Sequence, residues 1–262
     1  MSTAPQILVF TDLDGSFLDH HTYDYTPALP ALNRLKEKGA IILPATSKTL
    51  AEIKDLNLPF LFGDAIAENG MVTIRNNQIS TTKSYAEIIA FIQTLPNTIK
   101  TCITGFNDMT IDDIAKYTGL PQNQTALAKA RDASEPFLWS GTDDDLKTLT
   151  TLANTQNLTI TQGGRFYHLM GQGGKDAALQ NYMAAYHAEN PDKTTITIAL
   201  GDGPNDAKML SVVDYGIRIP NKHGHDFTVN NPKGEIIAAT SPGPAGWNQS
   251  ILHLLENLRL QH

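Results

Sequence analysis

The stretch Ile7-Leu8-Val9-Phe10-Thr11-Asp12-Leu13-Asp14-Gly15 joins an apolar run to two aspartates and a glycine. The run predicts a buried strand, and open α/β sheets bind ligands beyond the carboxyl ends of such strands. Side chains two residues apart on an extended chain point to the same side, so we expect Asp12 and Asp14 to converge. Two close carboxylates repel each other unless a cation intervenes, and Mg²⁺ prefers carboxylate oxygens. The pair therefore predicts half of a magnesium site.

A second apolar run, Thr195–Leu200, ends in another acidic loop, Gly201-Asp202-Gly203-Pro204-Asn205-Asp206. A helix is expected directly afterwards, over Ala207–Val213. Because Asp and Gly are ordinary turn residues, either loop alone would be a modest signal. Two acidic loops that follow two apolar strands favour metal-dependent chemistry over simple turn formation.

The composition is that of an acidic globular protein. The chain has 262 residues, 41% of them hydrophobic and 18% charged, which is enough for one large domain or two modest ones. Its net charge of −7, with no basic cluster, argues against nucleic-acid binding. Cys102 is the single cysteine, so no intramolecular disulfide is possible and a reducing compartment is expected. No stretch approaches the length of a membrane span, so we expect a cytoplasmic protein that does not act at a membrane.

The pattern of expected elements divides the chain into two parts. Residues 1–81 and 171–262 read as alternating strands and helices, with a hairpin around Asn76-Asn77. Residues 82–170 differ: a capping box at Ser84–Glu87 opens a helix, further helices are expected around 111–118, 122–131 and 143–157, and short strands at 158–161 and 165–170. The pattern predicts an α/β core with a doubly wound, mostly parallel sheet, into which an α+β cap domain (82–170) is inserted.

Four motifs resemble those of the haloacid dehalogenase superfamily of phosphohydrolases. They are the DxDG loop, an apolar strand ending in Thr46, Lys175 after a glycine-rich turn, and the GDGPND loop, in that order. Other stretches look like the mannosyl-3-phosphoglycerate phosphatases: ATSKT (45–49), AENG (67–70), TGFNDMT (104–110), SEPF (134–137), GGRFYHLMG (163–171) and GPAGW (243–247). The resemblance covers nearly the whole chain, and the combination is far more specific than any single motif.

The resemblance implies a phosphatase that works through an aspartyl phosphate. Asp12 would be the nucleophile, and Asp14 would protonate the leaving alkoxide and then deprotonate a water. Mg²⁺ would be held by the Asp12 side chain, the Asp14 main-chain carbonyl and Asp202, with Asp206 steadying a metal-bound water.

Three further residues are expected to meet the phosphate. Thr46 would donate a hydrogen bond to it, Lys175 would place a positive charge near it and Asp12, and Asn205 would steady the phosphate or the nucleophile. Taken alone, Thr46 is equally well interpreted as a turn or helix cap and Lys175 as a surface lysine.

Substrate-binding candidates lie in both parts of the chain. Lys48 and Asn69 are expected near the substrate from the core side, although Asn69 also suits a plain turn. The cap candidates are Arg131, Ser134, Glu135, Arg165 and His168, and Arg is suited to forked recognition of a carboxylate such as glycerate. Arg165 and His168 are three apart, so on a strand they point to opposite faces and both are not expected to reach the ligand. Surface salt bridges or a core histidine account for each cap residue equally well.

Two segments that suggest a nucleotide or metal cofactor lack the residues that such a site requires. The run Gly171–Asp176 lacks the first glycine and the hydroxyl residue of a phosphate-binding Walker loop, and no GxGxxG follows the first strand. His223-Gly224-His225-Asp226 has no partner cluster, so we interpret it as an exposed loop rather than a zinc or copper site.

The sequence therefore predicts a Mg²⁺-dependent phosphatase of a small phosphorylated sugar or glycosyl glycerate. Mannosyl-3-phosphoglycerate is the first choice of substrate, with glucosyl-3-phosphoglycerate and sucrose phosphate as alternatives. A phosphomutase of the same fold and a non-catalytic binder are the competing classes. The second is disfavoured because every reactive motif residue is present.

Overall fold

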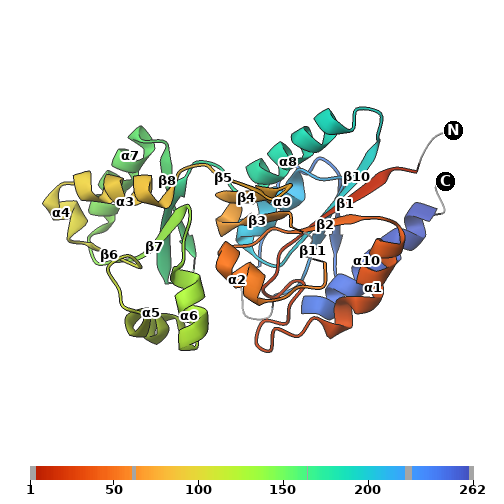
Figure 1. Ribbon diagram of the computed structural model, residues 1–262, viewed down its shortest axis with the longest axis horizontal. Helices are drawn as coiled ribbons and strands as arrows, with labels where there is room; N and C mark the ends of the chain where they lie inside the picture. Colours follow the sequence, from red (N-terminus) through yellow and green to blue (C-terminus); the bar gives the residue numbers. More distant parts are fainter. Residues whose placement is uncertain (1–3, 61–62, 164, 222–225, 260–262) are drawn as a thin grey trace.

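The computed structural model describes residues 4–60, 63–163, 165–221 and 226–259, which form two lobes (Figure 1). The larger lobe is built on a five-stranded, all-parallel sheet in the order β12-β11-β10-β1-β2. Its strands are β1 (Gln6–Thr11), β2 (Ile41–Pro44), β10 (Thr195–Gly201), β11 (Tyr215–Arg218) and β12 (Glu235–Ala238). The predicted parallel α/β core is confirmed.

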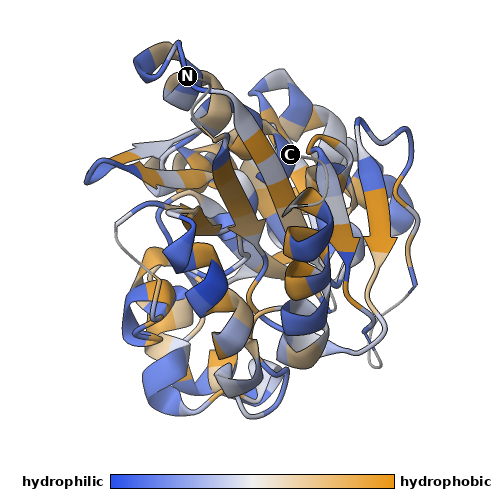
Figure 2. Ribbon diagram, turned by 90° about the vertical axis from the view of Figure 1, so that its right-hand side faces the viewer, coloured by the Kyte–Doolittle hydropathy of each residue, from blue (hydrophilic) through white to orange (hydrophobic). Residues whose placement is uncertain are grey.

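Helices cover both faces of this sheet. Helices α1 (Leu29–Glu37) and α10 (Gly243–Arg259) lie together on one face, and α8 (Lys175–Glu189) and α9 (Ala207–Ser211) on the other (Figure 1). In β1, Ile7 and Val9 pack in one apolar cluster with α1 and α10, while Leu8 and Phe10 pack in a second cluster with α8 and α9. A strand covered on both faces reads as an almost continuous apolar run, which is why 7–10 has no polar residue. Figure 2 shows hydrophobic residues along the strands in the interior of the molecule.

A small antiparallel sheet adjoins the parallel one. It contains β3 (Ala65–Ala67), β4 (Val72–Arg75) and β5 (Gln78–Thr81), and a bridge from Ala45 to Ile66 links it to the end of β2. Asn76 and Asn77 both have positive φ, as the two central residues of a type I′ hairpin turn require, and this hairpin was predicted.

Helices α2 and α1 begin in different ways. Helix α2 (Leu50–Asp55) begins with a capping box between Thr49 and Glu52. Helix α1 begins without such a cap: Thr26–Ala28 forms the 3-10 turn η1, and the Thr26 hydroxyl donates to the Asp24 carboxylate (2.6 Å).

The smaller lobe is the α+β insertion, and the predicted core-plus-cap fold is confirmed. Its antiparallel sheet has the order β6-β7-β9-β8, from β6 (Ile103–Gly105), β7 (Ser134–Trp139), β8 (Leu158–Gly163) and β9 (Phe166–Gly171). Its helices are α3 (Tyr85–Thr94), α4 (Asn97–Lys100), α5 (Ile111–Thr118), α6 (Gln122–Lys129) and α7 (Asp143–Thr155). The Ser84–Glu87 capping box and strands β8 and β9 follow the sequence prediction. Strands β6 and β7 and helix α4 were not predicted.

Two further sequence predictions concern the chain outside these sheets. The segment His223-Gly224-His225 lies outside the described residues. Among the described helices, none combines the length and the apolar character needed to cross a membrane.

Candidate active site

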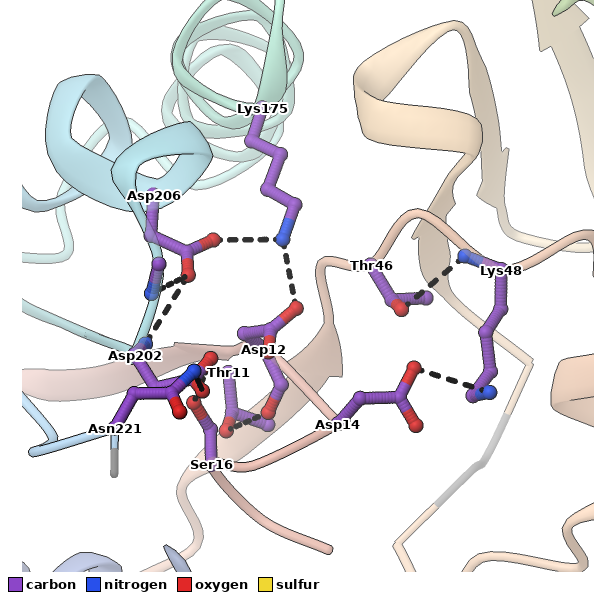
Figure 3. A network of polar contacts seen from close by, with 11 residues as sticks. Thr11, Asp12, Asp14, Ser16, Thr46, Lys48, Lys175, Asp202, Asp206 and Asn221 are labelled. Atoms are coloured by element: carbon purple, nitrogen blue, oxygen red, sulfur yellow. Dashed lines mark hydrogen bonds and ion pairs between the residues drawn. The ribbon is translucent and has the colours of Figure 1, made fainter. Parts of the chain in front are cut away.

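The two acidic loops meet at the carboxyl edge of the parallel sheet. Register places Thr11 of β1 beside Leu200 of β10, and the Asp12 amide donates to the Leu200 carbonyl (2.9 Å). The loops that follow these strands therefore emerge side by side. Carboxylate oxygens of Asp12, Asp202 and Asp206 lie within 4.8 Å of one another, and all three residues are buried (Figure 3).

Glycine allows the first loop to approach the second. Gly15 has φ +80°, and a Cβ atom there would lie 2.3 Å from Oδ2 of Asp202. In the second loop, Oδ2 of Asp206 accepts hydrogen bonds from the amides of Asp202 and Gly203 (both 3.1 Å). The positions of the acidic groups are therefore set largely by backbone contacts.

Lys175, the first residue of α8, is the cation of this cluster. Its Nζ lies 2.7 Å from Oδ1 of Asp12 and 2.7 Å from Oδ1 of Asp206, and its side chain is 1% exposed. Burial alone would lower the pKa of Lys175, but the two carboxylates outweigh it and hold that pKa above the usual value. Lys175 is therefore not the solvated surface lysine that it resembles in isolation.

The remaining negative charge suits a divalent cation. Burial, followed by repulsion from Asp12 and Asp206, raises the pKa of Asp202 to about 8. One ammonium thus faces three carboxylates in a water-poor site. Oxygen-only ligands of high negative charge are those that a hard cation prefers, so the residues present fit a divalent metal ion.

Asp14 does not join this cluster. Its Oδ2 lies 3.0 Å from Nζ of Lys48, and its side chain points toward Lys48 whereas that of Asp12 points toward Lys175 (Figure 3). The expectation that both side chains converge is wrong, because β1 ends at Thr11 and the chain turns from Leu13 onward. The Asp14 side chain is 32% exposed, whereas that of Asp12 is 9% exposed. Asp14 therefore borders open space beside the buried cluster.

Thr46 and Lys48 follow β2 at the same edge of the sheet. Thr46 is fully buried, and its hydroxyl accepts from the Lys48 amide (3.3 Å). The helix cap nearby is Thr49, so Thr46 caps no helix, and its bond from the Lys48 amide is the contact expected of a turn cap. Burial lowers the pKa of Lys48, but Asp14 and then Glu52 outweigh it and leave that pKa raised.

Asn69 and Asn205 lie on turns around the cluster. Asn69 has φ +57° in the 3-10 turn η2 (Glu68–Gly70), and its amide donates to the Thr46 carbonyl (2.9 Å). Among the described residues, no hydrogen-bond partner faces its buried Oδ1. Asn205 is exposed on η3 (Pro204–Asp206).

In the cap, three predicted residues have partners within the protein. The Arg131 guanidinium donates to the Ser47 carbonyl (3.2 Å) and to the Ser134 hydroxyl (3.4 Å). Glu135 is fully buried and accepts from the Asn107 amide (2.8 Å) and the Tyr85 hydroxyl (2.7 Å). Burial raises the pKa of Glu135 to about 7.

The other two cap residues lie in different environments. Arg165 is exposed just before β9, whereas His168 lies within β9 opposite Pro136 of β7. Burial, and then repulsion from Arg131, lowers the pKa of His168 to about 4, so this histidine is neutral at pH 7.

Sequence reasoning missed two polar residues at the site. Asn221, beyond the end of β11, donates to Oδ2 of Asp202 (2.7 Å), and the strand-end rule used for Asp12 would have found it. Glu68 lies in the AENG stretch, where only Asn69 was chosen, and its buried carboxylate contacts the cap. No local signal marks that contact.

A cavity of about 640 Å³ opens between the lobes beside Lys48. On the core side it is lined by the loop His20–Tyr23 and by Glu52, and on the cap side by Gly119–Pro121 and Gln124. Its volume lies in the range of small-molecule binding sites. Since Lys48 also pairs with Asp14, the cavity adjoins the polar site.

Comparisons with known proteins agree with this geometry. The sequence matches the family profile of the haloacid dehalogenase-like hydrolases over residues 9–225. It is 37% identical to a glucosyl-3-phosphoglycerate/mannosyl-3-phosphoglycerate phosphatase from Persephonella marina, over 96% of this chain and 98% of the relative.

Two solved structures share the fold. A phosphatase of the haloalkanoate enzyme superfamily from Bacteroides thetaiotaomicron superposes with a TM-score of 0.68 at 17% identity, covering 95% of both chains. The sucrose-phosphatase from Synechocystis, in complex with sucrose and phosphate, gives 0.61 at 14% identity, covering 95% of this chain and 98% of its own.

Proposed function

The chain belongs to the haloacid dehalogenase-like hydrolase family, and on that premise we propose that it hydrolyses a sugar-linked phosphoglycerate with the help of Mg²⁺. The family and the phosphatase relative make it a phosphatase. The first-choice substrate is mannosyl-3-phosphoglycerate, cleaved to mannosylglycerate and phosphate. The relative from Persephonella marina, which is named for the glucosyl and the mannosyl compound, supports this choice.

The reaction would proceed in two displacements at phosphorus. A carboxylate oxygen of Asp12 forms a bond to phosphorus while the bond to the glycerate oxygen breaks, and Asp14 gives its proton to that oxygen. Water then attacks the aspartyl phosphate, Asp14 takes the proton of that water, and Asp12 is regenerated. This role requires Asp14 to leave its ion pair with Lys48 and take up a proton before the first displacement, and its exposure supports this because the leaving group must be reached from the open side.

Asp12, Asp202 and the Asp14 main-chain carbonyl would hold Mg²⁺, with Asp206 near a water ligand. When bound, the ion neutralises charge so that a carboxylate and a phosphate dianion can approach each other. Lys175, already 2.7 Å from Asp12, would add a second positive charge, and Asn205 would steady the phosphate or the nucleophile. The buried Thr46 hydroxyl would donate to a phosphate oxygen.

Residues 82–170 would form the cap that selects the substrate. The cavity beside Lys48 is the space into which the sugar would extend, since it is lined by Lys48, the ion-pair partner of Asp14, and by residues of α5 and α6 of the cap. Lys48, Asn69 and the cap residues Arg131, Ser134, Glu135, Arg165 and His168 are proposed to shape the substrate site. Those of them that are buried would hold the walls of the substrate site in place while the cap is closed. They would meet the substrate directly only when the cap opens.

One observation carries the proposal: a buried cluster of three carboxylates and one lysine lies at the sheet edge where the family motifs meet. The test is phosphate release from mannosyl-3-phosphoglycerate, glucosyl-3-phosphoglycerate and sucrose phosphate, with Mg²⁺ and with EDTA. We expect release from a phosphoglycerate, lost in EDTA and restored by Mg²⁺. Release from sucrose phosphate alone would overturn the substrate class, and undiminished release in EDTA would overturn the metal assignment.

The glucosyl compound is the second candidate, because the relative is named for both sugars. A ratio of kcat/KM values above one for the mannosyl over the glucosyl substrate supports the first choice, and a ratio below one supports the second. Transfer of phosphate to a sugar hydroxyl rather than to water would identify a mutase.

A further inference from the structure

Glu68 connects the two lobes through a buried carboxylate. It follows β3 in the core, and the residue is 1% exposed. Three donors from one cap segment reach it: the Asp132 amide donates to Oε1 (2.7 Å), and the Ala133 amide (3.2 Å) and Ser134 hydroxyl (2.6 Å) donate to Oε2. A carboxylate from one lobe therefore binds consecutive residues of the other.

The backbone around Glu68 is bound to the loop after β2. The Glu68 amide donates to the Lys48 carbonyl (2.9 Å), and the Asn69 amide donates to the Thr46 carbonyl (2.9 Å). Lys48 in turn pairs with Asp14. One short turn thus contacts the Thr46–Lys48 loop through its backbone and the cap through its side chain.

Neighbouring contacts join the same two segments. Arg131 donates to the Ser47 carbonyl and to the Ser134 hydroxyl, which itself donates to Glu68. The Thr49 hydroxyl donates to the Leu127 carbonyl (2.9 Å). The cap segment 127–134 is therefore bound to Ser47, Thr49 and Glu68 of the core, and Glu68 supplies the only charged acceptor among these contacts of the described residues.

The Glu68 contact depends on the lobes being together. Hydrogen bonds to an ionised acceptor are stronger than neutral ones, and a buried carboxylate that loses its donors must be hydrated again. Glu68 also has φ +48°, which is uncommon for a residue with a side chain and persists where surrounding contacts hold it. Separation of the cap from the core would break all three hydrogen bonds at once.

We propose that Glu68 is a positioning residue that latches cap residues 131–134 to the Thr46–Lys48 loop. Cap closure over a large substrate and placement of Lys48 then become a single event, whereas Thr46 stays bound to Ile66 within the core. The choice of substrates for its test rests on the proposed function. A small ester such as p-nitrophenyl phosphate has no sugar for the cap to enclose, so its hydrolysis does not require the latch.

Two substitutions separate the latch from the turn. Glu68→Gln keeps the length of the side chain and removes its charge. Glu68→Asn is too short to reach residues 132–134, but Asn tolerates a left-handed backbone. The matched control is Glu87→Gln, since Glu87 accepts from a backbone amide and a hydroxyl within the cap and has no ion pair or hydrogen bond to the described part of the core.

The direct measurement is amide hydrogen exchange, because two of the donors are the Asp132 and Ala133 amides. We expect faster exchange over residues 131–134 in both Glu68 variants and no change there in Glu87→Gln. Unchanged exchange in both Glu68 variants overturns the latch. This measurement needs no substrate, so it decides the latch even if the proposed function fails.

The kinetic measurement distinguishes positioning from general damage. For the glycosyl phosphoglycerate we expect kcat/KM to fall at least about tenfold in Glu68→Asn, mainly through KM. For p-nitrophenyl phosphate we expect kcat/KM to stay within about twofold of wild type. An equal fall for both substrates overturns the positioning role. A wild-type protein that hydrolyses only p-nitrophenyl phosphate contradicts the proposed function and leaves the decision to amide exchange.

Discussion

The core and the cap of this protein both bury carboxylates, but they balance the charge differently. In the core, Asp12, Asp202 and Asp206 share one ammonium, that of Lys175, and the pKa of Asp202 is raised to about 8 by burial and mutual repulsion. In the cap, no charged group of the described residues lies at hydrogen-bond distance from Glu135, which accepts from an amide and a hydroxyl.

This difference distinguishes carboxylates that take part in the reaction from a carboxylate that stabilises the folded conformation. Groups held together against their mutual repulsion are characteristic of functional sites, whereas a fully hydrogen-bonded buried carboxylate stabilises one conformation. We therefore expect substitutions in the core cluster to abolish turnover. Substitutions in the cap should alter stability or substrate preference instead.

The largest expected effect is that of Asp12→Asn, which removes the proposed nucleophile. Phosphate release from any ester should fall by at least ~10³-fold, because the covalent route is lost. Phosphate release and circular dichroism are measured side by side, with Asp192→Asn in an exposed turn as the control. Turnover near the wild-type rate would show that the core cluster is not the reacting group.

Lys175→Met should affect stability as well as activity. Removal of one partner of a buried ion pair leaves uncompensated charge and costs about 3–5 kcal/mol. Urea unfolding in EDTA measures the loss, and Mg²⁺ should recover part of it because a cation binds the folded cluster. Lys233→Met, which removes an exposed ion pair with Asp214, should change the free energy of unfolding by less than ~0.5 kcal/mol. Equal changes in the free energy of unfolding for Lys175→Met and Lys233→Met would show that the buried lysine stabilises the fold no more than the exposed one.

Glu135→Gln should change how stability depends on pH. Folding raises the pKa of Glu135 from its ordinary 4.5 to about 7, chiefly by burial, so the folded state favours the protonated form. The associated stability is complete below pH 4.5 and is lost as the pH rises through 7, with a size of about 3 kcal/mol. Wild type should therefore lose stability relative to Glu135→Gln between pH 5 and pH 8, as measured by urea unfolding.

The control for this pH dependence has the opposite sign. Hydrogen bonds from Ser84 lower the pKa of the exposed Glu87, so its stabilising effect is present above pH 4.5 and is lost toward acid pH. The difference in the free energy of unfolding between wild type and Glu87→Gln should consequently become smaller as the pH falls. The same pH slope in the Glu135 and Glu87 variants would refute the assignment of the effect to burial.

The smallest expected effect is that of Arg165→Ala. Because Arg165 is exposed, the free energy of unfolding should change by less than ~0.5 kcal/mol. If its guanidinium contacts the glycerate, KM for the phosphoglycerate should rise about tenfold or more, by roughly the strength of one charged hydrogen bond, and KM for p-nitrophenyl phosphate should be unaffected. Unchanged KM values for both would remove Arg165 from the substrate site.

Features that depend on neighbouring residues in the chain were predicted well. The apolar strands that precede Asp12 and Asp202, the Asn76-Asn77 hairpin and the Ser84–Glu87 capping box each follow from a few consecutive side chains. In contrast, β6 has three residues and β7 contains Pro136, so neither shows a clear strand pattern. Their pairing with each other and with β9 makes them strands.

The sequence alone established that acidic loops follow two buried strands, and parallel register then brought those loops together. Only the tertiary structure decided where the individual side chains went. Asp14 turned to Lys48 because the strand ended before it, and Glu68 found donors more than sixty residues away in the cap. The physical reason is the separation along the chain over which each interaction acts. Strand formation and capping depend on a few consecutive residues. The partner of a buried charge depends on which segments the packed core brings within hydrogen-bond distance.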